Sequence, residues 1–399
     1  MANSILTPTA VTREALRILH QKLNFVGNIN RQYDDSFAKS GAKIGDSLKI
    51  RLPNQYTVRT GAVLNVQDTT ENSTTLQIAT QKGVDLNFSS IDLTLSLDDF
   101  SKRVLQPAMA VLAANIESDA LSMYKDVYNQ SNQSTITTAL SFATVLGARK
   151  KLNDNLAPGD ARKVILATQN NVDLVDALKG LFQDSSEIAS QYREGMMGRT
   201  AGFDFYENTL LQRHTSGSDT GAGTSITVNG ANQTGASLTV TNSGTKTLKK
   251  GDIFTLAGCN RAHPETKADT GVLQQFVVLA DAASTTVTFS PSIVLTGATQ
   301  NVIAAPTDSG ALTKVGGASG IMDVSLAFHP DAFTFATADL VMPQGVDFSA
   351  REVQDGLSIR IVRQYDINND KFPCRLDILY GYKTIRAALA SRIASNSSA

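Results

Sequence analysis

The chain has 399 residues, of which 42% are hydrophobic and 18% are charged, and its formal net charge is -1. This length exceeds the roughly 250–300 residues at which a single hydrophobic core stops growing, so we expect two or more folding units. A globular composition with almost no net charge argues against a protein that binds nucleic acid tightly over its whole surface.

The cysteines and the N-terminal residues narrow the class of protein. Cys259 and Cys374 lie far apart and belong to no CxxC motif, so the sequence predicts neither a disulfide framework nor a zinc site. The segment MANSILTPTA has no basic region followed by an apolar stretch, and the sequence has no run of about 18 apolar residues. These features predict a protein that is made and used in a cytoplasm.

The N-terminal residues show one amphipathic helix pattern. Apolar residues after position 12 recur at spacings of three and four, as on one face of a helix, at Ala15, Leu16, Leu19 and Leu23. The polar chain that follows has too little apolar surface for a core of its own. We therefore expect residues 1–44 to form an arm that lies on another surface.

Residues 45–89 alternate between apolar and polar side chains at both ends. The alternation at 48–52 and again at 84–88 predicts two strands, and the long segment between them is polar and prone to form strands. The sequence therefore predicts a long two-stranded hairpin arm. Because an isolated two-stranded hairpin is marginally stable in water, we expect another copy of the protein to stabilise it.

A long helix is predicted to begin at Pro107. Ser96 and Asp99 have the spacing of a capping box and indicate a short helix before it. The helix after Pro107 should extend over about 22 residues, or roughly 33 Å. Its apolar stripe consists of Ala108, Val111, Leu112, Ile116, Ala120, Met123 and Val127.

The remaining chain is predicted to be an α/β domain interrupted by an all-β module. Helices at 142–152 and 170–181 with a buried strand at 163–168 indicate a sheet flanked by helices. Residues 213–318 are rich in Thr, Ser, Gly and Ala and contain several short strand patterns, which indicates an inserted barrel or sandwich.

After the insertion, the interrupted sheet is expected to resume. Residues 322–340 are predicted to form a strand followed by a helix, and residues 356–385 two or three strands. The segment 370–390 is predicted to be a strand that ends in a basic, Ala-rich helix. The polar run 366–372 lacks the glycine and the terminal glutamate of a calcium loop, so we expect a hairpin turn there.

Reactive motifs are scarce. His20, His214, His263 and His329 stand apart from any metal-binding or catalytic spacing, and GxSxG and GxxxxGK[ST] motifs are missing from the sequence. The segment GMMGRTAG at 195–202 is better explained as a loop than as a phosphate-binding loop. We therefore expect no catalytic residues, no bound metal, no cofactor and no enzymatic activity.

The order of the predicted parts resembles that of tailed-bacteriophage major capsid proteins, which have the Hong Kong 97-type shell fold. Within that group the chain is most similar to the Salmonella podovirus coat-protein family, which carries an inserted β-barrel domain. The segments that carry the resemblance are GRTAGFDFYENTLL (198–211), ITVNGA (226–231), LKKGDIFTLAG (248–258) and LDILYGYKTIRAALASRI (376–393).

The resemblance implies an α+β capsid fold with an inserted barrel. The implied parts are an N-terminal arm (1–44), an extended hairpin or E-loop (45–89), a spine helix with peripheral domain (90–138), the first part of an axial domain (139–212), the inserted barrel (213–318), and the axial and peripheral return with the C-terminal sheet (319–399).

The implied function is self-association into the icosahedral shell that encloses packaged double-stranded DNA. The implied partners are many copies of the chain as hexamers and pentamers, a scaffolding protein, a portal, and DNA through non-specific contact, with no membrane. The implied location is the virion capsid, assembled in the cytoplasm of a bacterial host. Candidate interface residues are Arg59, Asp68, Glu71, Asp219, Lys267, Asp269, Arg386 and Arg392.

Two alternatives remain open from the sequence. An encapsulin-like nanocompartment shell has the same type of fold but encloses protein cargo. A surface or carbohydrate-binding protein would use the inserted module as a binding domain. For that role the module offers only Phe254, Phe276 and Phe289 as aromatic side chains, and the sequence shows no export signal.

Overall fold

The computed structural model describes residues 8–33, 47–64, 66–67, 71–89, 105–132, 139–178, 199–219, 226–243, 246–282, 285–316, 319–354, 356–368 and 371–396. The chain divides into two compact units, each assembled from distant segments. Unit 1 contains Met1–Arg51, Ser73–Leu121 and Phe333–Lys383, and unit 2 contains Leu52–Asn72, Ser122–Ala332 and Thr384–Ala399. The predicted short helix at 96–99 lies outside the described residues.

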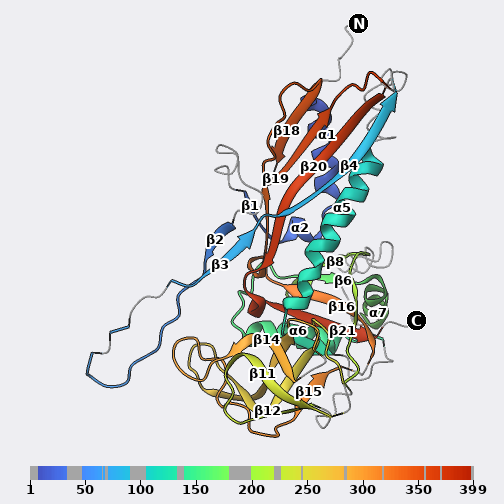
Figure 1. Cartoon of the computed structure of the whole chain (residues 1–399). Coiled ribbons are helices and arrows are strands. Elements are labelled where there is room, and N and C mark those ends of the chain that lie inside the picture. The colour runs from blue at the N-terminus through green and yellow to red at the C-terminus, as the bar shows by residue number, and fades with distance from the viewer. Residues whose placement is uncertain are drawn as a thin grey trace. The chain divides into compact units, whose positions relative to one another are not determined.

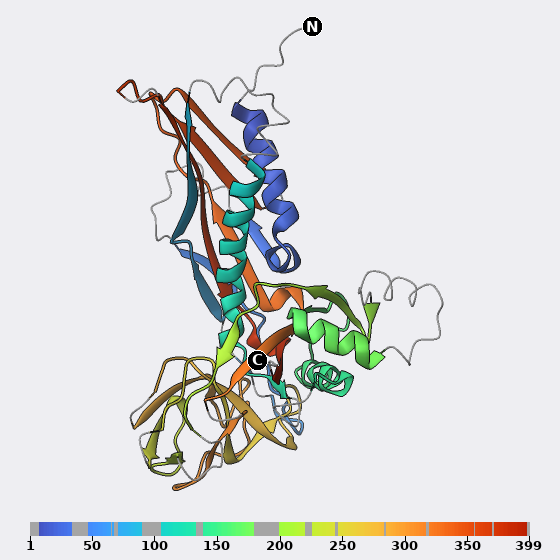
Figure 2. The same ribbon diagram turned by 90° about the vertical axis from the view of Figure 1, so that its right-hand side faces the viewer.

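Unit 1 is a mixed sheet covered by helices on one face (Figures 1 and 2). In order across the sheet, its strands are β1 (Asn30–Tyr33), β17 (Phe333–Ala338), β20 (Lys371–Thr384), β19 (Leu357–Arg363) and β18 (Phe348–Gln354), with β4 (Thr80–Ser89) also paired to β20. The helices are α1 (Pro8–Lys22), α2 (Phe25–Asn28) and α5 (Gln106–Leu121). Strands β19 and β20 pair antiparallel, and a bridge joins Asp366 to Lys371 where the hairpin turn was predicted.

The N-terminal residues are part of this unit rather than a separate arm, so the predicted 1–44 arm is wrong for its described part. Helix α1 packs against β18, β19 and α5, and its side chains Ala15 and Leu19 are fully buried. The buried carboxylate of Glu117 on α5 accepts hydrogen bonds from the backbone N–H groups of Phe25 and, at 3.2 Å, Val26. These bonds satisfy donors that the start of α2 leaves open, and they fix the segment to its own chain.

The hairpin is shorter than predicted. Strands β2 (Ser47–Arg51) and β3 (Ser73–Gln77) pair antiparallel, with Ser47 opposite Gln77. The predicted return strand at 84–88 instead lies within β4 and pairs with β20. Alternation identifies a strand with one buried face, but it does not identify the neighbouring strand.

The hairpin stem is stabilised by its own chain, which corrects the expectation that another copy is needed there. Leu76 and Ile78 are buried in a cluster with residues of the unit 1 sheet and the segment after it, and Leu48 and Ile50 pack against the same cluster. The remaining cluster residues are Ala336, Ala338, Leu340 and Leu379. Only the residues beyond the stem still require an explanation.

The long helix begins as predicted but ends earlier. Helix α5 has 16 residues and continues as a single 3-10 stretch, η3 (Ser122–Asp126), instead of reaching the predicted 22 residues. Its predicted apolar stripe is buried except for Val111, which is 59% exposed.

Unit 2 contains a second sheet, which resumes after the insertion as predicted. In order, its strands are β5 (Gln130–Asn132), β21 (Ala390–Asn396), β16 (Ile321–Phe328), β6 (Lys163–Leu166), β8 (Phe203–Glu207) and β7 (Arg199–Thr200), with β9 (Arg213–Thr215) also paired to β16. Its predicted helices are α6 (Phe142–Asp154) and α7 (Thr168–Leu178).

The helices predicted within 322–340 and at the end of 370–390 are not formed. Residues 333–338 form β17, preceded by the short helix η4 (Pro330–Ala332), and residues 390–396 form β21, preceded by η5 (Ala387–Leu389). All six residues of β17 are buried. A strand buried on both faces shows no polar alternation, and its Ala-rich composition then imitates a helix.

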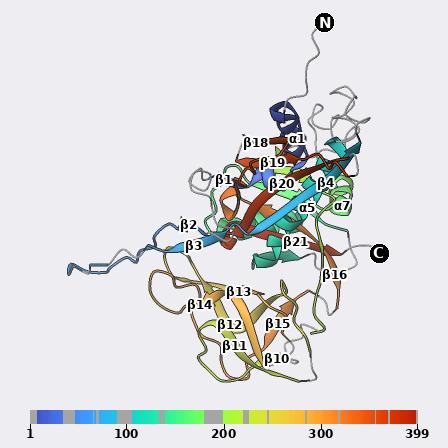
Figure 3. The same ribbon diagram turned by 45° about the horizontal axis from the view of Figure 1, so that its top comes forward.

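The inserted module is a six-stranded antiparallel barrel (Figure 3). Its strands, in spatial order, are β10 (Ile226–Val228), β11 (Gly235–Asn242), β14 (Thr286–Ile293), β13 (Asp269–Val278), β12 (Ile253–Ala262) and β15 (Leu312–Val315). A bridge between Thr227 in β10 and Ala311, the residue just before β15, joins the two end strands and closes the barrel. The barrel agrees with the all-β module predicted for residues 213–318.

The barrel core is built around three phenylalanines. Phe254, Phe276 and Phe289 are at most 1% exposed, and their ring centroids lie 5.2–5.8 Å apart. They are therefore not available to stack on a sugar, which removes the observation that would have supported a carbohydrate-binding module.

Both cysteines are free and buried, in agreement with the expected lack of a disulfide. Cys259 lies in the barrel core and Cys374 lies on β20 of unit 1. Burial raises the pKa of Cys259 to about 11 and the pKa of Cys374 to about 12. The two thiols therefore stay protonated at neutral pH.

Arg392 was expected at a subunit interface, and the structure contradicts this. Its side chain is 0% exposed, and its guanidinium donates to the carbonyl of Gly251 at 2.8 Å and to the side-chain oxygen of Gln130. Burial lowers the pKa of Arg392 to about 10, so it remains charged at neutral pH. The guanidinium is therefore bonded within its own chain, and its hydrogen bonds connect the barrel to strand β5.

The buried side chains of Tyr124, His214, Asp252 and Arg392 form a set that we call the polar latch. The Tyr124 hydroxyl lies 3.4 Å from His214 Nδ1, and His214 Nε2 lies 2.8 Å from Asp252 Oδ1. The Arg392 guanidinium carbon lies 5.8 Å from the centroid of the Tyr124 ring. His214 belongs to β9 of the sheet and Asp252 precedes β12 of the barrel, so the latch connects the two.

Asp252 is the most constrained member of the polar latch. Its Oδ2 accepts hydrogen bonds from the N–H groups of Gly217 at 2.9 Å and Lys249 at 2.8 Å. Burial would raise the pKa of Asp252, but the hydrogen bonds from His214, Lys249 and Gly217 outweigh burial and hold the pKa below its usual value. The sequence predicted only a turn at this position.

Replacing Gly381 tests the close approach of β20 to the hairpin. A Cβ at Gly381 would lie 2.2 Å from the carbonyl oxygen of Gln77, which is backbone and cannot rotate away. We expect Gly381→Ala to lower the free energy of unfolding by about 1–3 kcal/mol in urea denaturation of the unassembled subunit. Gly27→Ala is the control, because a Cβ there meets no atom within 4 Å. Equal stability of the two variants would contradict this packing.

Replacing Asp252 tests the polar latch. We expect Asp252→Asn to lower the free energy of unfolding at pH 7 by about 1–3 kcal/mol, because the amide cannot accept all three hydrogen bonds. Since the folded-state pKa of Asp252 is depressed, its contribution is complete above about pH 4, its unfolded value, and is lost as the pH falls through the folded pKa. Urea denaturation from pH 7 to pH 3 should therefore show a steeper loss for wild type than for Asp252→Asn.

The matched control for Asp252 is Asp281→Asn, at the other side of the same turn. The Asp281 side chain is 60% exposed, although it accepts a hydrogen bond from Lys250 N at 2.8 Å. We expect its replacement to change the free energy of unfolding by less than about 1 kcal/mol. A similar loss in the two variants would show that the buried carboxylate has no special role.

Candidate assembly surfaces

The residues beyond the hairpin stem expose an unusual number of apolar side chains. Five of them, which we call the apolar tip, are Tyr56, Val58, Val63, Leu64 and Val66, with exposed fractions of 58%, 94%, 85%, 77% and 76%. Single exposed apolar residues are common on protein surfaces, but a group of this kind within one short segment marks an interaction site.

The two limbs that carry the apolar tip are held together by a few polar bonds. Thr57 N donates to Gln67 Oε1 at 2.9 Å, and Gln67 Nε2 donates to the Thr57 carbonyl at 2.6 Å. Leu52 N donates to the Asn72 carbonyl at 2.8 Å. These bonds orient the limbs without burying the apolar side chains.

The predicted interface residues of the hairpin are only partly described. Arg59 is exposed and donates to the carbonyl of Gly61, and Glu71 is also exposed. Asp68 lies outside the described residues. Charged residues were predicted as the contacts here and the apolar tip was not, because the spacing of two between Tyr56 and Val58 and between Leu64 and Val66 suggests only a strand and does not indicate exposure.

Of the three interface residues predicted in the barrel, one presents an exposed charge. Asp269 is exposed, and hydrogen bonds from Gly271 N at 2.8 Å and Asn260 Nδ2 at 3.1 Å lower the pKa of its carboxyl. Asp219 is 1% exposed, so it cannot meet a neighbour and its prediction is wrong.

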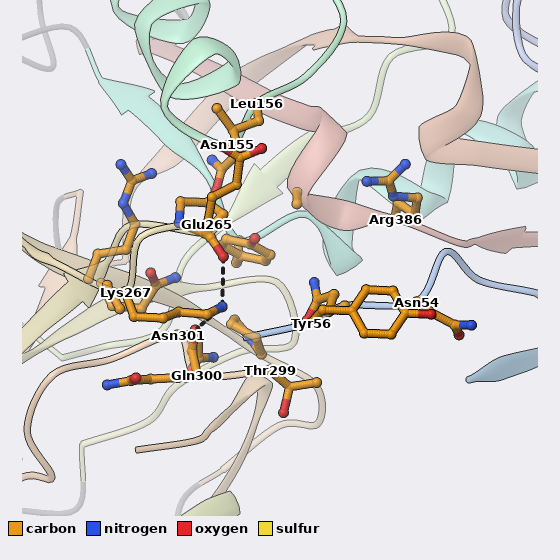
Figure 4. Close-up of a pocket in the computed structure, with 18 of the residues that line it drawn as sticks. Asn54, Tyr56, Asn155, Leu156, Glu265, Lys267, Thr299, Gln300, Asn301 and Arg386 are labelled. Atoms are coloured by element: carbon orange, nitrogen blue, oxygen red, sulfur yellow. Dashed lines mark hydrogen bonds between the residues drawn. The ribbon is translucent and has the colours of Figure 1, made fainter. Parts of the chain in front are cut away.

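Lys267 is half-buried, and its amine is used inside the chain. Its Nζ donates to the carbonyls of Pro264 at 2.7 Å and Gln300 at 3.3 Å, and burial lowers the pKa of the amine. This arrangement ties two barrel loops together (Figure 4). At the C-terminal end of the chain, Arg386 is exposed, unlike Arg392.

Searches for other kinds of site within the described residues give two results. No helix in those ranges is long and apolar enough to cross a membrane. No group of three or more His, Cys, Asp or Glu side chains there is placed to hold a metal ion.

Comparison with known proteins adds an independent finding. The family model described as P22 coat protein, gene protein 5, matches residues 28–390. None of the curated proteins compared matches the chain.

Several solved structures are similar to the chain. A structure of Mycobacterium phage Che8 is 14% identical, with a TM-score of 0.48 over 93% of this chain and 90% of that one. The capsid of Ralstonia phage GP4 is 7% identical, with a TM-score of 0.49 over 95% and 92%. The CUS-3 coat protein I-domain is 36% identical, with a TM-score of 0.19 over 23% of this chain and 96% of that one.

The family match covers most of the chain, including the barrel, the unit 1 sheet and the second sheet up to the start of β21. It agrees with the predicted capsid fold and favours a phage coat protein over a nanocompartment shell. Members of a coat-protein family are structural proteins that form shells from many copies. The chain therefore belongs to the P22 coat protein family and is a major capsid protein of a tailed bacteriophage, located in the shell of the virion.

Proposed function

We propose that the apolar tip is the main contact through which one copy of this chain holds the next in the capsid. The observation that carries this proposal is the group of five exposed apolar side chains on a hairpin whose stem is already packed. The two limbs of the tip are already joined by the hydrogen bonds between Thr57 and Gln67 and between Leu52 and Asn72, so the ordering cost of binding is reduced.

The expected energy of this contact favours assembly from many copies. Burying five side chains of this size contributes about 8–15 kcal/mol before any cost is subtracted. Association of two proteins costs about 4–15 kcal/mol in lost freedom of motion, so one contact alone is weak. Closed symmetry gives each copy several such contacts at once, and growth then ends in a shell.

The exposed charges contribute little to the strength of the contact between two copies, but they favour one orientation of the neighbour over others. Arg59, Glu71, Asp269 and Arg386 are exposed in the single chain. A surface ion pair contributes about 0–1 kcal/mol, which is small beside the apolar tip. Such pairs favour correctly placed neighbours over misplaced ones.

We further propose hexamers and pentamers of the chain as the units of an icosahedral shell that encloses double-stranded DNA. A net charge of -1 supports weak, non-specific contact with the DNA, which lets the genome leave. A scaffolding protein and a portal are the partners that the family resemblance implies, with assembly in the bacterial cytoplasm. This role needs no cofactor and no catalytic side chain, and we propose that the chain is not an enzyme.

The double variant Val63→Ser, Leu64→Ser tests the apolar tip. Both side chains are more than three-quarters exposed, so we expect the free energy of unfolding to change by less than about 0.5 kcal/mol. Loss of two apolar contacts should raise the concentration of subunit needed for assembly at least tenfold, measured by light scattering and electron microscopy.

The matched control is Val172→Ser on α7, where the valine is 58% exposed but stands apart from the hairpin in sequence. We expect this variant to assemble at the wild-type concentration. If the double variant forms closed shells as readily as wild type, the hairpin is not the main contact.

A further inference from the structure

A cavity of about 590 Å³ lies within unit 2, where three parts of the chain meet. Its walls come from the barrel loops at 261–267 and 299–301, from the sheet domain at Tyr128, 155–156 and Arg386, and from the hairpin limb at 54–58. Figure 4 shows side chains from all three parts around the same space. We call it the three-part cavity.

Two arginines line this cavity. Arg261 is 16% exposed, and its nearest acid is Asp154, with 3.7 Å between Nη2 and Oδ2. Its Nε is buried and has no acceptor among the described residues. Arg386 also lines the cavity and is exposed, so water solvates its guanidinium. Neither guanidinium has a carboxylate partner closer than 3.7 Å among the described residues, so an acidic ligand in the cavity meets cations that are not closely paired.

The charges around the three-part cavity are mostly positive. Arg261, Lys267 and Arg386 line it, and among the described lining residues Glu265 is the only acid. The pKa of Lys151 is lowered to about 8, mainly by burial and secondly by the positive charge of Arg261. Burial raises the pKa of Tyr128 to about 12 although Arg261 and Arg386 act in the opposite direction, so the phenol keeps its proton.

We propose that the three-part cavity binds a carboxylate carried by an acidic segment of a second copy of this chain. A guanidinium presents parallel N–H donors that match the two oxygens of a carboxylate, and the cavity has two guanidiniums with donors to offer. The proposal rests on the proposed function, since it needs copies that meet. In this proposal the charged cavity distinguishes a correctly placed neighbour from a misplaced one, which the apolar tip alone does not do.

A second copy fits the site better than nucleic acid. The volume matches pockets that hold a small ligand or a few side chains, and a duplex cannot enter it. Glu265 on the wall repels a polyanion more strongly than a single carboxylate. Tyr56 and Val58 of the apolar tip are themselves part of the cavity wall, so a neighbour held by the tip is brought to the cavity.

The test compares Arg386→Gln and Arg261→Gln with wild type in the full-length chain. We expect each to raise the concentration of subunit needed for assembly about fivefold at low salt. At about 1 M salt, where the screening length is about 3 Å, the difference from wild type should disappear. Lys250→Gln is the matched control, because Lys250 is an exposed barrel cation that does not line the cavity.

Cross-linking identifies the occupant directly. Shells are assembled from equal amounts of isotopically heavy and light subunits and treated with a carbodiimide, which joins an amine to a carboxyl without a spacer. The Lys267 amine lines the cavity, and it reacts with a bound carboxylate when its hydrogen bonds to the carbonyls of Pro264 and Gln300 open. We expect heavy–light peptides that join Lys267 to an aspartate or glutamate, and their absence would overturn the proposal.

The remaining outcomes separate this proposal from the proposed function. If wild type forms shells and both arginine variants assemble identically to it, the cavity proposal is wrong while the capsid function stands. If wild type forms no shells under any condition, the proposed assembly itself fails. If both variants lower the thermal unfolding midpoint and assemble poorly at every salt concentration, the arginines are structural and the cavity proposal is again wrong. Inhibition by inorganic phosphate without heavy–light cross-links would indicate a free-anion site instead.

Discussion

The fully buried charge of Arg392 is the constraint on which the arrangement of unit 2 depends. Removing a guanidinium from water costs several kcal/mol unless its donors are satisfied. Its acceptors come from the barrel, at Gly251, and from strand β5, at Gln130. Separating the barrel from the sheet domain therefore breaks the hydrogen bond that the cation donates to the Gly251 carbonyl. Gln275 of the barrel strengthens the same junction, since it accepts a hydrogen bond from Gln130 N at 2.9 Å.

The order of elements was predictable from the sequence wherever one face of an element meets water. Alternation in the hairpin stem and in the barrel strands, and the helical stripe of α5, identified these elements because polar and apolar positions separate. Strand β17 was predicted as a helix because it is buried on both sides, and composition alone then decides. The helix expected at the end of 370–390 is instead the short turn η5, which leads into β21. Pairing partners were less predictable, as β4 shows, because a period carries no information about the neighbouring strand.

The candidate surfaces were harder to predict than the fold. Charge in the sequence indicated Asp219 and Arg392, yet both are buried, because a buried ion looks the same as an exposed one in a sequence. The apolar tip was missed since its exposure depends on the lack of a packing partner, which is a tertiary property. Arg261 was missed for the related reason that the three-part cavity joins segments about 200 residues apart, at 54–58 and 261–267.

The two buried thiols bear on how a shell survives outside a cell. A virion leaves a reducing interior for oxygenated surroundings, where exposed low-pKa cysteines form mixed disulfides or are oxidised further. Cys259 and Cys374 are shielded and protonated, so air oxidation has no ready thiol target on this chain. The cysteines therefore give oxygen no route to cross-link or modify the particle after its release.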